Sequence, residues 1–181
     1  VLRRWKIEKD LWLSLHPKPW SEAVLREYGE KFGGKVDQWL DQGRGSCCLR
    51  RRDCAEIVSQ VIRNSDGDSV NLDVMVVMPN HVHVLFFLKE GIRLESLLQQ
   101  WKGISSHKIN QALQRKGPLW MRDYWDRMIR GPEHYDHVRK YILSNPAKAG
   151  LAAGNHLLWS ASTPVWEQLK EKGYSVRARN S

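Results

Sequence analysis

The sequence predicts an α+β fold in which helices flank one antiparallel β-sheet. Residues 70–88 contain two apolar, β-branched runs separated by Pro79-Asn80, and this pattern is typical of an antiparallel hairpin. On both sides of the hairpin, apolar residues recur at helical spacing. The chain has 181 residues, enough for one sizeable core, so we expect a single domain over residues 1–181 that ends in a polar tail at 155–181.

The spacing of apolar residues and the residues at helix starts predict that the first elements are helices. Residues 1–15 and 21–42 predict two helices, with Ser21 as N-cap of the second. Gly33-Gly34 weakens the helical pattern in the middle of the second range.

The central elements are a helix followed by the hairpin. In residues 51–64 the apolar residues share one helical face, and Asp53 lies near the start of this helix. Residues 70–78 are nearly all apolar and predict a central strand. Residues 81–88 predict the strand that returns beside it.

The C-terminal half predicts a helix, a strand and a second helix. An apolar stripe runs from Leu94 to Leu113 and predicts a long amphipathic helix ending at Gly117-Pro118. Residues 119–130 predict a bent strand. The next helix begins at Pro132, which suits a first helical turn, and should stop at Asn145-Pro146.

Charge and composition limit the class of partner. Lys and Arg number 29 against 20 acidic residues, and the net charge of +9 favours nucleic acid or an anionic membrane surface. Nine Trp favour unpaired bases, on which indole rings stack, although most Trp side chains serve as core residues. No apolar run approaches the ~20 residues of a membrane span. An odd count of three Cys favours reduced thiols and a cytoplasmic location.

His81 and His83 are one residue apart in an apolar strand, so both side chains point to the same face of the sheet. Two imidazoles on one face can bind one metal ion, but a third ligand must come from elsewhere. The alternative is a pair of histidines that are only hydrogen-bonded at the sheet surface.

Tyr141 and Asn145 are four residues apart and share one face of the last long helix. The Asn145 amide oxygen is a hard ligand that suits Mg²⁺ or Mn²⁺, and the Tyr141 phenol is a candidate nucleophile. The alternative is structural: Tyr141 packs beside Val138 and Ile142, and Asn145 is the helix C-cap before Pro146.

The segments NHVHVLF and YILSNPAKAGL together resemble the HUH tyrosine transposases of the IS200/IS605 type, and most closely the REP-associated tyrosine transposases of bacteria. The resemblance extends from about Pro19 to Trp159. It implies a ferredoxin-like HUH nuclease fold. The family opens with a β-strand, whereas this chain begins with VLRRWKIEKDLWL, so the implied sheet lacks its first strand.

The resemblance assigns roles residue by residue. His81 and His83 match the pair that holds a divalent metal, Asn145 matches the third ligand, and Tyr141 matches the nucleophile. Tyr135 does not match. The implied activity is that of a Mg²⁺- or Mn²⁺-dependent endonuclease that nicks and rejoins hairpin-bearing single-stranded DNA through a 5′-phosphotyrosine.

The implied partner is single-stranded or hairpin DNA, bound by a monomer or homodimer, with no membrane involved. Candidate contacts to the DNA backbone are Lys102, His107, Lys108, Arg122, Arg127 and Arg130. Each also fits a solvated surface charge. Two other functions remain open: a catalytically silent protein that binds DNA hairpins, and a zinc hydrolase that uses the histidine pair with a further His or carboxylate.

Overall fold

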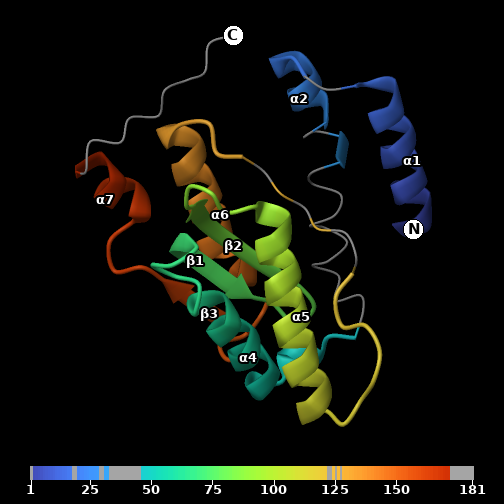
Figure 1. Cartoon of the computed structure of the whole chain (residues 1–181), viewed down its shortest axis with the longest axis vertical. Coiled ribbons are helices and arrows are strands. Elements are labelled where there is room, and N and C mark those ends of the chain that lie inside the picture. Colours follow the sequence, from blue (N-terminus) through green and yellow to red (C-terminus); the bar gives the residue numbers. More distant parts are fainter. Residues whose placement is uncertain are drawn as a thin grey trace. The chain divides into compact units, whose positions relative to one another are not determined.

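A computed structural model of the chain describes residues 2–17, 20–28, 31–32, 46–121, 124, 126 and 128–171 (Figure 1). The chain divides into two compact units, Val1–Arg44 and Gly45–Ser181. Within the described part of the chain, every helix is too short or too polar to span a bilayer.

The N-terminal unit contains α1 (Leu2–Leu15) and α2 (Glu22–Tyr28), joined by aromatic packing. Trp12 is buried, and its indole Nε1 donates a hydrogen bond to Glu27 Oε1 at 2.9 Å. Its ring lies 5.4 Å from that of Trp20 and 5.2 Å from that of Tyr28, measured between centroids. The first predicted helix is confirmed. The second is confirmed as far as Tyr28, and most of its remaining range lies outside the described residues.

The second unit is built on a three-stranded antiparallel sheet, so the predicted α+β class and hairpin are confirmed. The strands are β1 (Val70–Val77), β2 (Val82–Leu88) and β3 (Leu157–Ser160), in the order β2-β1-β3. In the hairpin, Val77 pairs with Val82 and Val76 pairs with His83.

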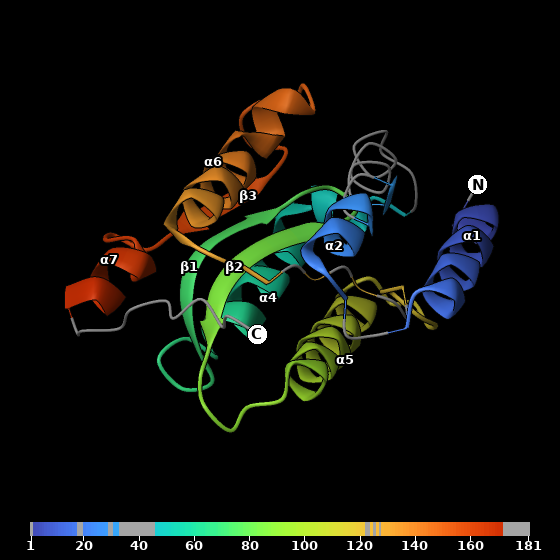
Figure 2. The same ribbon diagram turned by 90° about the horizontal axis from the view of Figure 1, so that it is seen from above.

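Helices cover both faces of this sheet, as Figure 2 shows from above. On one face, α4 (Arg52–Arg63) and α5 (Leu94–Ala112) pack on alternate strand residues such as Met75 and Val77. On the other face, α6 (Pro132–Lys148) and α7 (Val165–Glu171) pack on the intervening residues Val74 and Val76.

A β-bulge in β1 interrupts this alternation at Asp73. The pairing register with β2 shifts between Leu72 and Val74, so that Leu72 packs on the α4/α5 side and Val74 on the α6/α7 side. The Asp73 side chain is fully buried and accepts hydrogen bonds from α6 and from the start of α7. The bulge therefore supplies the polar attachment between the central strand and the helix that carries Tyr141.

The end of α6 differs from the prediction. The helix does not stop at Asn145-Pro146 but continues through Pro146 to Lys148, with Ala149 as C-cap. A proline inside a helix lacks the N–H that would bond the carbonyl four residues earlier, and its ring also crowds that carbonyl. The Ala149 amide still donates to the Asn145 carbonyl at 2.9 Å, and Pro146 is buried, so packing offsets the lost bond.

Two other expectations also differ from the structure. Among the described residues of 119–130 there is no strand, so the predicted bent strand is wrong there. Residues 155–171, expected to be part of a polar tail, include β3 and α7, and α7 buries Val165 and Trp166. Their apolar residues are too few to show a clear period in the sequence, and pairing with β1 is what orders β3.

The hydroxyl of Ser105 links α5 to the segment that follows it. This side chain is 1% exposed, donates to the Trp101 carbonyl at 2.6 Å, and accepts a hydrogen bond from Trp120 Nε1 at 2.9 Å. We expect Ser105→Ala to lower the free energy of unfolding by about 1–2 kcal/mol, because Trp120 loses its acceptor. Urea denaturation measures this change. Ser106→Ala is the control on the same helix, and an equal loss in both variants would contradict the role of the Trp120 bond.

Candidate functional site

The two histidines lie on the face of the sheet that α6 covers. Along β2, Val82 and Val84 pack on the α4/α5 side, whereas Leu85 packs on the α6/α7 side. His83 therefore points toward α6, in keeping with strand alternation. The Nε2 atoms of His81 and His83 are 3.1 Å apart, and the two rings are nearly perpendicular, at 87°.

Helix α6 brings Tyr141 to the same place. The Tyr141 ring lies against His83, with 5.6 Å between centroids and an interplanar angle of 84°. Two residues earlier on α6, Arg139 donates from Nε to Asp73 Oδ1 at 2.8 Å, and the Tyr135 hydroxyl donates to Asp73 Oδ2. These bonds attach α6 to the central strand at a fixed position and thereby orient Tyr141.

The two tyrosines of α6 have different surroundings. Tyr135 is 2% exposed, and its burial, with the hydrogen bond to Asp73, raises the pKa of its phenol well above the ordinary value. Tyr141 is half-buried and faces the histidine pair. Tyr135 therefore keeps its proton as a structural donor, and Tyr141 is the phenol in contact with the candidate site.

Asn145 follows Tyr141 by one helical turn and is 1% exposed. Among the described residues, its Oδ1 atom is buried without a hydrogen-bond partner. A buried acceptor without a partner costs about 1–3 kcal/mol, so its presence requires an explanation. A bound cation would supply one.

The His81 imidazole is electrically neutral, which is the form that binds metal ions. His81 is 8% exposed, and burial lowers its pKa to about 3, with a smaller contribution from His83. His81 Nδ1 donates to Asn80 Oδ1 at 2.8 Å, because an amide oxygen can only accept, and this leaves the Nε2 lone pair toward His83. The separation of 3.1 Å between the two Nε2 atoms places both ring nitrogens close enough together that they could hold one ion.

Clusters of three His, Cys, Asp or Glu side chains that could hold a metal ion are absent from the described ranges. The residues present nevertheless fit a divalent cation if the amide of Asn145 is counted with the two imidazoles. The orphaned Oδ1 atom is the observation that supports this donor set.

The predicted DNA contacts on α5 lie across the sheet from Tyr141. Lys102 is engaged within the chain: its Nζ donates to the Met121 carbonyl at 3.0 Å and lies 5.5 Å from the centroid of the Tyr124 ring. His107 and Lys108 are exposed. Because α5 and α6 cover opposite faces, these side chains cannot contact the same phosphate as Tyr141.

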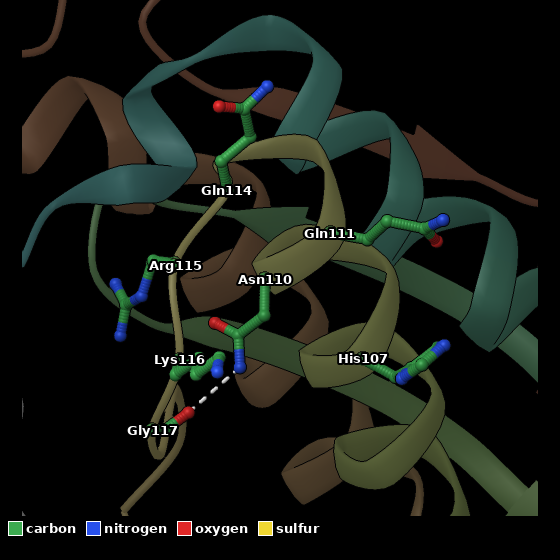
Figure 3. A pocket seen from close by; sticks show the side chains of 7 residues that line it. All are labelled: His107, Asn110, Gln111, Gln114, Arg115, Lys116 and Gly117. Atoms are coloured by element: carbon green, nitrogen blue, oxygen red, sulfur yellow. Dashed lines mark hydrogen bonds between the residues drawn. The ribbon is translucent and has the colours of Figure 1, made fainter.

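An open hollow of about 560 Å³ lies near the end of α5, and part of its lining is basic (Figure 3). Its lining includes His107, Arg115 and Lys116, and the Asn110 side chain donates to the Gly117 carbonyl at 2.8 Å. This hollow is distinct from the histidine site.

The remaining predicted contacts lie before α6. Arg130 is exposed, and its backbone N–H donates to His134 Nδ1 at 3.4 Å. Arg122 and Arg127 lie outside the described residues.

The sequence interpretation missed two residues near the site. Asp73 is the one carboxylate in a strand that is apolar except for Asp73 and Asn71, and a carboxylate there indicates a buried polar contact. Lys148 follows Tyr141 at i+7, and its Nζ lies 4.9 Å from the centroid of the Tyr141 ring. Because the helix was expected to end at Pro146, the sequence did not predict that Lys148 lies on the same helix as Tyr141.

Comparisons with known proteins indicate the family of this chain. Residues 47–145 match the family model "Transposase IS200 like", which covers more than half of the chain. A "REP-associated tyrosine transposase" of Escherichia coli (strain K12) is 30% identical over 79 residues, which are 44% of this chain and 46% of that protein. A "Putative REP-associated tyrosine transposase" of Haemophilus influenzae is 29% identical over 84 residues, covering 41% and 48% of the two chains.

The chain thus spans about half the length of the curated relatives it matches. No solved structure matches significantly. The matched range contains His81, which precedes β2, His83 on β2 and Tyr141 on α6. These residues belong to the two segments that carry the resemblance in the sequence. The chain therefore belongs to the IS200-like transposase family.

Proposed function

We propose that this protein is a metal-dependent DNA strand transferase that nicks and rejoins hairpin-bearing single-stranded DNA through a 5′-phosphotyrosine. The observation that carries the proposal is the contact between Tyr141 and His83, beside the two Nε2 atoms 3.1 Å apart. Because one chain supplies both rings, we propose that Tyr141 serves the histidines of its own subunit.

In the proposed step, the phenolic oxygen of Tyr141 attacks the phosphorus of a phosphodiester. The Oη–P bond forms and the P–O3′ bond breaks. The phenolic proton passes to water, and the departing O3′ takes up a proton to become a free 3′-OH. The new phosphotyrosine conserves the energy of the phosphodiester, so a 3′-OH can reverse the reaction without ATP.

Asn145, His81 and His83 would hold a divalent cation. When bound, such an ion polarises the phosphate and offsets the charge that develops on its oxygens. Two imidazoles and an amide are softer ligands than the all-oxygen set that Mg²⁺ prefers. We therefore expect Mn²⁺ to support the reaction at least as well as Mg²⁺.

The net charge of +9 supports a polyanionic substrate. Attack by a tyrosine requires a backbone that is open to the site, which favours unpaired DNA near the scissile bond. His107 and Lys108 lie on the opposite face from Tyr141, so contacts with them would engage a remote part of the DNA, such as the stem of a hairpin.

The test is the capture of a covalent protein–DNA adduct under denaturing conditions. The protein is incubated with Mn²⁺ and a pool of hairpins that carry randomised single-stranded flanks. We expect a 3′-end label to remain on the protein and a 5′-end label to leave on a fragment with a free 3′-OH. EDTA should abolish the adduct, and blunt duplexes of the same sequences should form none.

Three results would contradict this proposal. A 5′-end label on the protein would mean the opposite polarity of attack. An adduct that persists in EDTA would remove the role of the metal. No adduct from any member of the pool would favour a protein that only binds hairpin DNA.

A further inference from the structure

The last turn of α6 carries a lysine that the proposed reaction does not use. Lys148 is exposed, and its Nζ lies over the ring of Tyr141, 4.9 Å from the centroid. Among the described residues, Tyr141 is the side chain with which the Lys148 ammonium interacts. Arg139, another cation on α6, is by contrast occupied by the buried Asp73.

The position of Lys148 follows from the continuation of α6 through Pro146. Residues 141, 145 and 148 are spaced i, i+4 and i+7, so Tyr141, Asn145 and Lys148 lie along one face of the helix. A positive charge in the last turn also interacts favourably with the C-terminal end of the helix dipole. The structure thus aligns the phenol, the orphaned amide and the ammonium in one row.

The position of this ammonium suggests what it does. Its Nζ lies 4.9 Å from the centroid of the Tyr141 ring, beside the phenol of the proposed attack. A phosphodiester brings a negative charge to the site, and attack by Tyr141 concentrates that charge on the non-bridging oxygens. A lysine has three N–H donors on a flexible stem, so its ammonium can leave the ring face for an oxygen that arrives beside it.

We propose that Lys148 binds a non-bridging oxygen of the phosphate that Tyr141 attacks. This inference rests on the proposed function, since it needs a phosphodiester at Tyr141. Lys148 would then be a catalytic residue, because it touches the reacting group. The competing explanation is a cation–π contact that only steadies the Tyr141 ring.

The test compares Lys148→Met, which removes the charge but keeps much of the side-chain length, with Lys148→Arg, which keeps the charge. Lys140→Met is the matched control, since Lys140 is also exposed on α6 but lies off the Tyr141 face. Two quantities are measured for each: the rate of adduct formation, and the salt dependence of binding to the same hairpin DNA. Thermal melting verifies that each variant folds, and Lys148→Gln is the second neutral variant.

We expect Lys148→Met to slow adduct formation by about tenfold or more, because one donor to the developing charge is lost. The slope of log K against log salt should become shallower by about 0.7, the value for one phosphate contact on a single strand. Lys148→Arg should restore most of the rate and the slope. Lys140→Met should leave the rate unchanged.

An unchanged rate or an unchanged salt slope in Lys148→Met overturns the inference. So does a failure of Lys148→Arg to restore the rate, because an arginine keeps the charge. If the wild-type protein forms no adduct but binds DNA, the proposed function fails while the salt slope still decides whether Lys148 contacts a phosphate. If the wild-type protein binds no DNA, both proposals are overturned.

Discussion

Tyr141→Phe should abolish the covalent protein–DNA adduct and leave folding and DNA binding intact. The substitution removes only the hydroxyl, so the ring can still pack against His83 and beneath Lys148. Without Oη there is no nucleophile to form the phosphotyrosine, and the adduct should fall below detection. Denaturing electrophoresis with 3′-labelled DNA measures the adduct, and a binding assay on the same DNA verifies that affinity is retained.

Tyr135→Phe and Tyr124→Phe are the controls for this result. Tyr135 is buried against Asp73, and Tyr124 contacts Lys102, so neither hydroxyl is at the histidine pair. Both variants should form the adduct, provided that each variant folds. If Tyr141→Phe retains the adduct and Tyr135→Phe loses it, the nucleophile has been assigned to the wrong residue.

Asp73→Asn should lower the free energy of unfolding strongly, although it replaces a carboxylate by an amide of nearly the same shape. The Asp73 carboxylate is 0% exposed and accepts hydrogen bonds from the Tyr135 hydroxyl, from Arg139 Nε at 2.8 Å and from the Val165 backbone N–H at 2.9 Å. Asparagine lacks the charge, and its NH₂ group would face one of these donors. Breaking a buried charge pair in this way costs about 3–5 kcal/mol, since the partner is left without compensation.

Urea denaturation of Asp73→Asn measures this loss. Asp68→Asn, in an exposed turn before β1, is the control and should change the free energy of unfolding by less than about 0.5 kcal/mol. Tyr135→Phe removes one of the three bonds to Asp73 and should cost about 1–2 kcal/mol. Equal stability of Asp73→Asn and Asp68→Asn would show that Asp73 does not anchor α6.

The sequence by itself determined the features that depend on local spacing. Strand alternation placed His81 and His83 on one face, and the helical repeat placed Tyr141 and Asn145 on another. The hairpin at Pro79-Asn80 and the amphipathic helices followed from the same periodicities. The two motif segments also sufficed to indicate the family, because they combine residue identity with spacing.

Tertiary structure alone decided how these faces meet. Nothing in the spacing of α6 indicated that it packs on the histidine side of the sheet, or that α5 packs on the opposite side and carries His107 and Lys108 away from Tyr141. The continuation of α6 through Pro146, and with it the place of Lys148, depends on the burial of Pro146. The bulge at Asp73 depends on partners about 60 to 90 residues away in the sequence. Periodicity reports which side of an element is apolar, whereas the choice of its partner is set by packing and buried hydrogen bonds between distant segments.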